Sequence, residues 1–234
     1  MPADARTEAL RSNLARVRQR IDRAAAAAGR DPAELTLIAI TKTFPAADVA
    51  RLAELGLTDF GENRDAEAHD KAAGFPALRW HFVGQLQRNK ARSVAEYAAV
   101  VHSVDRPRLV TALHNAAEQA GRDLDVLLQV SLEPAAAGDR GGAQPEQLAE
   151  LAAAVEDAGR LHLRGLMAVA PLAEPAPAAY ARLADIAAEF RGRYPAAAIL
   201  SAGMSGDLEA AVTHGATHLR IGTALLGGRS AIVR

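Results

Sequence analysis

The sequence of 234 residues contains no cysteine, which excludes disulfides, thiol nucleophiles and cysteine-ligated metal sites together. Aromatic residues make up only 4 %, and alanine supplies much of the 50 % hydrophobic content, a composition that favours closely packed helices. The net charge of −1 provides no global field that would attract nucleic acid or an anionic membrane. We therefore expect no nucleic acid and no membrane among the partners of this chain.

Signals for export, membrane insertion and common nucleotide or hydrolase chemistry are also missing. No apolar run approaches the roughly 20 residues that span a bilayer, and the N-terminal segment lacks the apolar core of a secretory signal. The sequence has no Gly-x-Gly-x-x-Gly after a strand, no Walker loop and no Gly-x-Ser-x-Gly elbow. No second histidine stands at metal-ligand spacing from His81, so we expect no metal site. These absences predict a cytoplasmic protein.

Apolar runs alternate with alanine-rich segments of helical character along most of the chain. The runs predicted as strands are 35–41, 57–62, 79–84, 99–105, 125–132, 163–170, 197–203 and 217–225. Helices are predicted over 5–28, 45–55, 63–73, 87–95, 106–121, 144–159, 175–193 and 205–214. This alternation indicates βαβ units and a parallel sheet.

Eight strands in a chain of this length fit a single (β/α)8 TIM-type barrel, an α/β fold, with an extra N-terminal helix. An open doubly wound sheet is the alternative, because it tolerates the same pattern of elements. No linker divides the chain, so we expect one domain over residues 1–234. The loosest segments, 133–146 and 171–179, follow predicted strands, and in a barrel they would lie on the functional face.

Lys42 directly follows the apolar run LTLIAIT and so lies at the predicted exit of the first strand. One interpretation is an ordinary strand-end lysine that reaches solvent. The other is an amine that forms an imine with an aldehyde or ketone, since a partly desolvated lysine loses its proton more readily. The residue alone does not decide between these two interpretations.

The segments SAGMSGDLEAAV (201–212) and HLRIGTALLGG (218–228) place small residues at the predicted ends of the last two strands. Ser205 is expected to cap the following helix, while Gly222 and Thr223 offer a bare backbone and a hydroxyl. Barrels often bind phosphate in the loops after strands seven and eight. Turn formation would explain each residue singly, but together they predict a phosphate site.

Arg220 lies in the last predicted strand and is expected to point into the barrel, where a buried guanidinium needs an acceptor. Glu62, at the end of the second strand, is one candidate acceptor, and a ring nitrogen of a ligand is the other. Glu62 is also expected close to Lys42 across adjacent strands. His81 lies within the third strand and is interpreted as a core histidine.

These stretches together resemble the pyridoxal phosphate homeostasis proteins, the YggS/PROSC family. The similarity is carried, in order, by AITKTFP, FGENRDAEAHDK, WHFVGQLQRNK, HSVD, GLMAVAP and LSAGMSGDLEAAVTHGATHLRIGTALLGGR. It extends from about residue 10 to about residue 229, which is nearly the whole chain. The resemblance implies a single barrel similar to the N-terminal domain of alanine racemase.

The resemblance also implies how the site residues bind pyridoxal 5′-phosphate (PLP). Lys42 would hold PLP as an internal aldimine, and Arg220 would face the pyridine nitrogen. An arginine cannot accept a proton and keeps that nitrogen unprotonated, which makes the ring a weaker electron sink. The other matching positions are Asn63 beside the cofactor and, for the phosphate, Ser205, Gly222 and Thr223.

The implied function is a PLP carrier in intracellular PLP (vitamin B6) homeostasis, with little or no turnover and no catalytic residue. PLP-dependent apo-enzymes are candidate recipients, and the family resemblance favours a monomer. Alanine racemase completes its site with a second, β-rich domain that supplies a tyrosine. The tyrosines of this chain fall in or beside predicted helices, at Tyr97, Tyr180 and Tyr194.

Two other functions also fit the residues. An amino-acid racemase of the alanine racemase type would use Lys42 as one base, and a cofactor-free barrel would use it for aldolase-type imine chemistry. The chain also departs from the family pattern. Gln85 stands where a histidine is frequent, and the loop 133–146 lacks the usual asparagine and Lys-x-Gly turn. These departures concern the mouth of the barrel and leave the implied cofactor residues intact.

Overall fold

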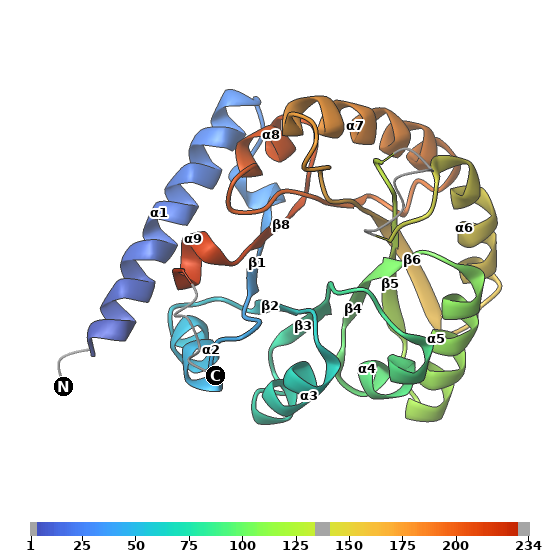
Figure 1. The fold of residues 1–234 in the computed structure, drawn as a ribbon, viewed down its shortest axis with the longest axis horizontal. Helices are drawn as coiled ribbons and strands as arrows, with labels where there is room; N and C mark the ends of the chain where they lie inside the picture. Colours follow the sequence, from blue (N-terminus) through green and yellow to red (C-terminus); the bar gives the residue numbers. More distant parts are fainter. Residues whose placement is uncertain (1–3, 134–140, 229–234) are drawn as a thin grey trace.

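Eight parallel strands close into a barrel in the order of the chain, as the ring in Figure 1 shows. The structure is a computed structural model that describes residues 4–133 and 141–228, so part of the predicted loop 133–146 lies outside the described residues. β1 pairs with β2 on one side and with β8 on the other, which closes the sheet and excludes the open alternative. The strands are β1 (Thr36–Ile40), β2 (Asp59–Glu62), β3 (Arg79–Phe82), β4 (Val100–Val104), β5 (Leu124–Gln129), β6 (Leu161–Met167), β7 (Ile199–Ser201) and β8 (His218–Ile221).

Helices cover the outside of the ring between successive strands, so the predicted TIM-type (β/α)8 fold is confirmed (Figure 1). The extra helix α1 (Ala5–Ala27) precedes the barrel and packs beside α8 and α9. Within the described residues the other helices are α2 (Ala46–Glu54), α3 (Asp65–Gly74), α4 (Ala91–Tyr97), α5 (Pro107–Ala120), α6 (Leu148–Glu156), α7 (Ala176–Arg193), α8 (Leu208–Thr213) and α9 (Thr223–Leu226). Short 3-10 turns are η1 (Pro32–Glu34), η2 (Arg88–Lys90) and η4 (Pro145–Gln147).

The last two strands end earlier than the sequence predicts. β7 spans only Ile199–Ser201, and residues 223–225, predicted as the end of the last strand, belong to the short helix α9. The stretch LRIGTALL has apolar residues on both sides of its glycine and therefore resembles one continuous buried strand. In the structure Leu225 and Leu226 are buried instead as part of α9, which packs beside α1.

The hydrophobic core has two parts, one outside the sheet and one inside it. The larger part lies between the strands and the surrounding helices. Alternate residues of a strand point to opposite faces, and His102 of β4 reaches across the barrel to Ser201 of β7. The smaller cluster contains Val100, which shares the inward face of His102, and therefore fills part of the interior; its members are Val100, Leu127 and Met167.

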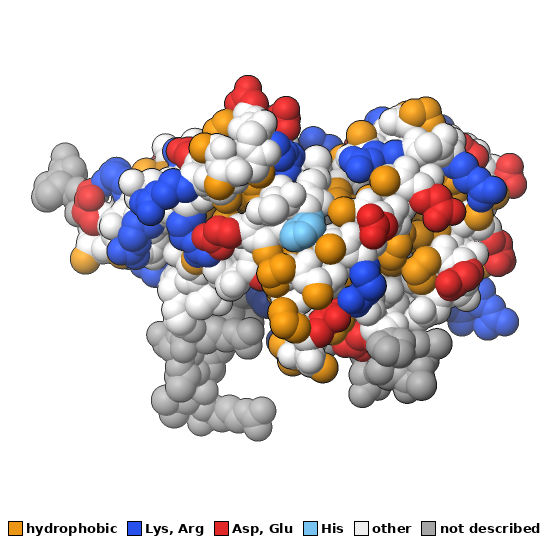
Figure 2. Space-filling model, turned by 90° about the horizontal axis from the view of Figure 1, so that it is seen from above, with side chains coloured by type: hydrophobic (Ala, Val, Ile, Leu, Met, Phe, Trp, Pro, Cys, Tyr) orange, Lys and Arg blue, Asp and Glu red, His pale blue; other side chains and the backbone are white. Residues whose placement is uncertain are grey.

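Figure 2 shows one face of the molecule, on which acidic and basic side chains are interspersed with scattered hydrophobic ones. Neither sign of charge forms a continuous field over this face, in keeping with the net charge of −1. Among the described residues, no helix combines the length and the apolar character that crossing a bilayer requires.

Candidate functional site

The predicted cofactor residues lie at the carboxyl ends of strands that are neighbours in the ring, namely β7, β8, β1 and β2. In the register of β1 and β8, Ala39 pairs with Ile221. Gly222 therefore lies beside Ile40 of β1, where an added Cβ would be in ordinary van der Waals contact, 3.5 Å from the Cβ of Ile40. The structure therefore brings one arc of the barrel rim together from residues far apart in sequence: Lys42, Asn63, Ser205, Arg220, Gly222 and Thr223.

Lys42 lies in a tight turn of residues 41–44, which a 3.0 Å hydrogen bond from the Phe44 N–H to the Thr41 carbonyl closes. Thr43 in this turn has a φ of 68°, a conformation that is rare for a β-branched residue and is typical of strained functional sites. The N–H of Thr43 donates to Glu67 Oε1 at 2.6 Å. This bond from α3 holds the turn that presents Lys42.

A buried ionic cluster on α3 supports the same turn from outside the barrel. Lys71 Nζ donates to the Thr41 carbonyl at 2.8 Å, to Glu62 Oε1 at 2.6 Å and to Glu67 Oε1 at 2.7 Å. The side chains of Lys71 and Glu62 are only 6 % and 1 % exposed. Burial raises the pKa of Glu62, and the hydrogen bonds from Lys71 and Thr41 oppose that rise.

The sequence has three lysines, and the structure gives them different surroundings. Lys71 is fully engaged in the cluster just described, and Lys90 is exposed at the surface with its Nζ 3.6 Å from Asp65 Oδ2. Lys42 is partly buried and forms no hydrogen bond or ion pair with any residue that the structure describes. Its amine is therefore the lysine Nζ that remains available for chemistry at the rim.

Ser205 joins the loops that follow β7 and β8, because its Oγ accepts a 3.1 Å hydrogen bond from the N–H of Ala224. The N–H groups of Gly206, Gly222 and Thr223 have no hydrogen-bond partner in the described part of the chain. Free backbone donors and a nearby hydroxyl at adjacent loops are the groups that bind phosphate in many barrels. The arrangement is therefore suited to an anion.

The predicted capping role of Ser205 is wrong, because α8 begins at Leu208 and Asp207 occupies the cap position. The loop is anchored instead by Tyr180 of α7, a residue that the sequence analysis did not assign. The Tyr180 hydroxyl donates to Asp207 Oδ2 at 2.9 Å and accepts from the N–H of Gly203 at 3.2 Å. Gly203 has a φ of 90°, which glycine adopts without strain.

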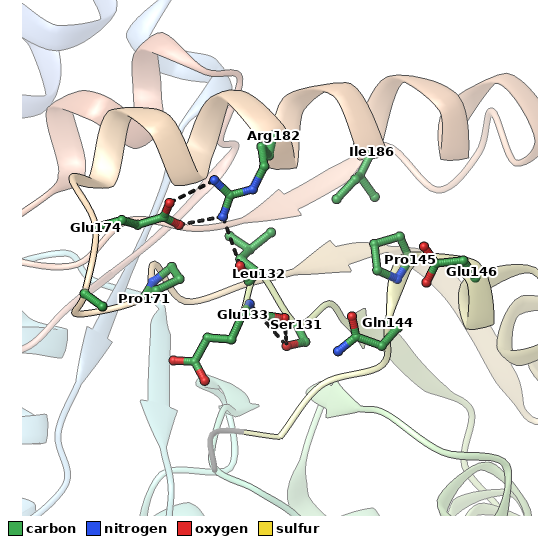
Figure 3. A pocket seen from close by; sticks show the side chains of 11 residues that line it. Ser131, Leu132, Glu133, Gln144, Pro145, Glu146, Pro171, Glu174, Arg182 and Ile186 are labelled. Carbon is green, nitrogen blue, oxygen red and sulfur yellow. Dashed lines mark hydrogen bonds and ion pairs between the residues drawn. The ribbon is translucent and has the colours of Figure 1, made fainter. Parts of the chain in front are cut away.

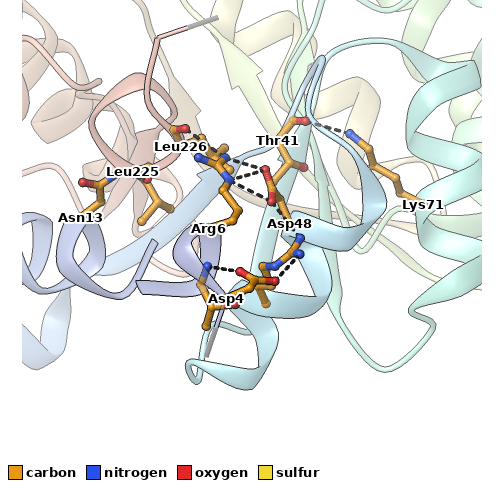
Figure 4. A network of polar contacts seen from close by, with 10 residues as sticks. Asp4, Arg6, Asn13, Thr41, Asp48, Lys71, Leu225 and Leu226 are labelled. Carbon is orange, nitrogen blue, oxygen red and sulfur yellow. Dashed lines mark hydrogen bonds and ion pairs between the residues drawn. The ribbon is translucent and has the colours of Figure 1, made fainter. Parts of the chain in front are cut away.

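Helix α1 braces the neighbouring loop from outside the barrel (Figure 4). Asn13 Nδ2 donates to the Leu225 carbonyl at 2.9 Å, and Arg6 donates to the Leu226 carbonyl at 3.1 Å. Arg6 also pairs with Asp48 of α2, the helix that follows the Lys42 turn. One helix thus holds the segments on both sides of the candidate site.

Arg220 is 5 % exposed and lies in the barrel interior. One terminal nitrogen donates to Ser201 Oγ at 2.7 Å and the other to the Ala168 carbonyl at 2.8 Å. Of the two candidate acceptors for Arg220, Glu62 is excluded, because Glu62 faces α3 and is bonded to Lys71. No described carboxylate pairs with Arg220, and burial lowers the pKa of its guanidinium, which nevertheless stays charged.

Asn63 follows β2 and has a buried Oδ1 without a hydrogen-bond partner in the described residues. Gly84 packs against it so closely that an added Cβ would lie 2.3 Å from the Asn63 carbonyl oxygen. The arc thus offers a free amine, a guanidinium without a directly bonded carboxylate, an unpaired acceptor and free N–H donors. Such a set fits a ligand that carries both a reactive carbonyl and a phosphate.

A separate cavity of ≈ 670 Å³ lies between the loops after β5 and β6 (Figure 3). Arg182 of α7 borders it, donating to the Leu132 carbonyl at 2.9 Å and pairing with Glu174. The two loops that the sequence places on the functional face therefore meet here. None of the predicted cofactor residues lines this cavity.

A chain of hydrogen-bonded side chains crosses the barrel interior next to Arg220. His81 is buried, as predicted, but it bonds to Asp59 Oδ1 and to His102 Nε2, each at 2.9 Å. His102 in turn contacts Ser201 Oγ at 3.0 Å. The sequence analysis missed this network because its members come from four strands. Strand alternation, which assigns each of these positions to the inward face, was the available signal.

Buried histidines in this interior are expected to make the protein sensitive to acid. Burial, together with repulsion from His81 and Arg79, lowers the pKa of His218 to about 4. An unfolded histidine titrates near 6.5, so below that pH the unfolded chain binds more protons than the folded one. The free energy of unfolding should therefore fall by about 2 kcal/mol between pH 7 and pH 5 through His218 alone.

Urea unfolding at the two pH values measures this loss. Burial also lowers the pKa values of His81 and His102, so their contributions have the same sign. The variant His218→Gln should show a smaller loss than the parent protein. His162→Gln, at a side chain that is 46 % exposed, is the matched control and should leave the loss unchanged. Equal stability at both pH values would contradict the prediction.

Comparison with known proteins gives one family for nearly the whole chain. The family model of the alanine racemase N-terminal domain matches residues 6–230. The pyridoxal phosphate homeostasis protein of Escherichia coli strain K12 is 42 % identical over 230 residues, covering 93 % of this chain and 95 % of the relative. The protein of the same name from Pseudomonas aeruginosa is 46 % identical over 222 residues, with coverages of 93 % and 94 %.

A solved structure shows the same architecture at a comparable level of identity. PipY of Synechococcus elongatus, solved with PLP bound, is 35 % identical and has a TM-score of 0.81. The match covers 93 % of this chain and 100 % of the PipY chain. The arc of residues at the ends of β7, β8, β1 and β2 lies within residues 6–230, which match the model of the alanine racemase N-terminal domain.

Proposed function

The chain belongs to the pyridoxal phosphate homeostasis proteins, within the family of the alanine racemase N-terminal domain, and we propose that it binds PLP and serves PLP homeostasis. The observation that carries this proposal is the solved relative with PLP bound, which matches 93 % of the chain. The rim of the barrel supports it, because the free amine and the free N–H donors there suit an aldehyde that carries a phosphate.

Lys42 is the residue that we propose to hold PLP covalently. Its amine, when neutral, adds to the aldehyde carbon, and loss of water leaves a C=N bond, a Schiff base that water can hydrolyse again. Lys42 suits this role because it has no partner among the described residues, whereas Lys71 donates to three acceptors. The reversibility of this bond is what a carrier needs.

The remaining contacts follow from the chemistry of the two ends of PLP. We assign the phosphate to the loops after β7 and β8, through Ser205, Gly222 and Thr223, because the free N–H groups of the site gather there. Asn63 would lie beside the cofactor with its unpaired Oδ1. When bound, PLP supplies an aldehyde and an electron-accepting ring.

Arg220 fits a protein with little turnover, because it would make the bound ring a weak electron sink. Its guanidinium cannot take up a proton or release one at ordinary pH, so it would donate to the ring nitrogen and leave that nitrogen unprotonated. A ring of this kind stabilises negative charge on the substrate weakly, which disfavours racemisation. The relatives that match over at least 93 % of both chains are named homeostasis proteins, which supports little or no turnover.

We further propose that residues 1–234 act as one PLP-binding domain, as a monomer in the cytoplasm, which passes PLP to apo-enzymes. The support for this is the family membership and the high coverage of both chains in each comparison. Light scattering of the purified protein tests the oligomeric state. Transfer is tested by adding the loaded protein to a PLP-dependent apo-enzyme and following the recovery of its activity.

The proposed function is tested by titrating the purified protein with PLP and recording its absorbance. We expect stoichiometric binding with a visible-edge band, and after borohydride reduction a stable adduct whose mass maps to Lys42. Pyridoxal, which lacks the phosphate, should bind at least about 100-fold more weakly, since two or more charge-assisted hydrogen bonds are lost. L-alanine should remain unconverted; conversion at ordinary enzymatic rates would favour the racemase alternative.

A further inference from the structure

The barrel interior connects Arg220 to the opposite end of the sheet through an unbroken series of side-chain hydrogen bonds. Arg220 donates to Ser201 Oγ, Ser201 contacts His102 Nδ1, and His102 Nε2 contacts His81 Nδ1. His81 Nε2 then contacts Asp59 Oδ1. The histidines, Ser201 and Arg220 are each at most 5 % exposed, whereas Asp59 lies at the amino end of β2 with 16 % of its side chain exposed.

The two ends of this series fix the direction of every bond in it. A guanidinium only donates and a carboxylate only accepts. Burial raises the pKa of Asp59, but hydrogen bonds from His81 and Thr58 outweigh it and hold the pKa below its usual value. Asp59 is therefore ionised at neutral pH, and His81 must present an N–H to it at Nε2.

The histidines between the two ends are neutral, because burial lowers the pKa of both His81 and His102. A neutral imidazole donates at one nitrogen and accepts at the other. His81 donates at Nε2 and therefore accepts at Nδ1 from His102 Nε2–H. His102 then accepts at Nδ1 from the Ser201 hydroxyl, which itself accepts from Arg220. The tautomer of each ring is therefore determined, and both His81 and His102 carry their proton on Nε2.

We propose that Asp59, His81, His102 and Ser201 form a directional hydrogen-bond relay that orients Arg220 toward the ring nitrogen of bound PLP. This inference rests on the proposed function. The relay places a carboxylate at the far end of an aligned row of dipoles, which balances the guanidinium at a distance. It fixes one terminal nitrogen of Arg220, and the Ala168 carbonyl fixes the other, so the remaining N–H groups keep one direction. These are positioning residues, because none of them is assigned a contact with PLP.

The direction of the relay is tested in the protein without PLP. Long-range nitrogen–proton NMR spectra of histidine-labelled protein at neutral pH should show His81 and His102 with the proton on Nε2. In Asp59→Asn the amide can also donate, so we expect a second set of signals from rings protonated on Nδ1. Asp125→Asn is the control, since Asp125 acts on His81 only through charge and bonds to Arg79 and Arg164. Protonation of either ring on Nδ1 in the parent protein would overturn the proposal.

The positioning role is tested by removing one hydroxyl from the relay. Ser201→Ala should bind PLP about tenfold more weakly, the effect of one lost hydrogen bond to a charged group. Ser103→Ala is the matched control, because Ser103 is equally buried on β4 and its Oγ has no hydrogen-bond partner among the described residues. It should bind PLP within about twofold of the parent. Asp59→Asn, a change at the amino end of the barrel that keeps the size of the side chain, should also weaken PLP binding.

An analogue of PLP with carbon in place of the ring nitrogen separates orientation of Arg220 from general packing. Ser201→Ala and the parent protein should bind this analogue equally, since the contact that the relay serves is absent. Equal binding of PLP itself by both proteins would overturn the positioning role. Failure of the parent protein to bind PLP would instead overturn the proposed function. The NMR experiment would still test the direction of the hydrogen bonds, because it uses protein without PLP.

Discussion

Lys42→Ala is expected to abolish covalent retention of PLP, from a stoichiometric adduct after borohydride reduction to none. The C=N bond needs a lysine amine that is free and lies at the cofactor site. Neither of the other two lysines meets both conditions. Lys71 is enclosed by Thr41, Glu62 and Glu67, and Lys90 lies near Asp65 on the surface. Mass spectrometry of the reduced protein and the loss of the visible-edge band measure the effect.

Lys90→Ala is the matched control for this experiment, because it removes an exposed lysine amine without touching the rim. It should retain the band and the full adduct. Non-covalent PLP should still bind to Lys42→Ala through the phosphate loops and should be lost on gel filtration. An undiminished adduct in Lys42→Ala would show that another amine carries PLP.

Lys71→Met is expected to lower the free energy of unfolding by about 3–5 kcal/mol, the usual cost of leaving one partner of a buried ion pair without the other. The Glu62 carboxylate would remain buried at 1 % exposure with only the Thr41 hydroxyl as a donor. The Thr41 carbonyl and Glu67 would also lose their bonds to Nζ, so the turn that carries Lys42 should loosen. Urea unfolding measures the loss of stability. PLP titration shows whether the loosened turn at Lys42 weakens the affinity for PLP.

Two comparisons make this prediction specific to the buried pair. The double variant Glu62→Gln with Lys71→Met removes both charges and should recover part of the lost stability. Lys90→Met breaks only a surface contact of 3.6 Å and should cost less than about 1 kcal/mol. Equal losses for Lys71→Met and Lys90→Met would contradict a buried, cooperative cluster.

The barrel was predictable from sequence because two periodicities alternate along the chain with little interruption. Apolar runs such as LTLIAIT predict strands, and the helical periodicity of segments such as α1 predicts helices. The exception is α9, where Gly222 interrupts an apolar run that reads as one strand. Helix or strand cannot be told apart over so few residues, because both bury the same leucines.

The candidate site was predictable where neighbours in space are also strand ends, as for Lys42 and Gly222. It was not predictable where a side chain selects among several partners. Glu62 and Arg220 lie on opposite faces of the sheet, a difference that the shared parity of Glu62 with Phe60 of the outer core could have revealed. Tyr180 and the histidine network needed the fold itself, because their partners lie on other strands and loops.

The hydrogen bond between Arg6 and the Leu226 carbonyl joins residues that are 220 positions apart. This separation determines how long the ribosome takes to synthesise Leu226 after Arg6. At synthesis rates of about 5–20 residues per second, helix α1 emerges roughly 10–45 seconds before the segment that it braces. During that interval the nascent chain has an N-terminal helix without its C-terminal partners. A nascent chain that does not yet reach Gly222 and Thr223 lacks the loops to which we assign the phosphate, so it cannot bind PLP in the proposed way.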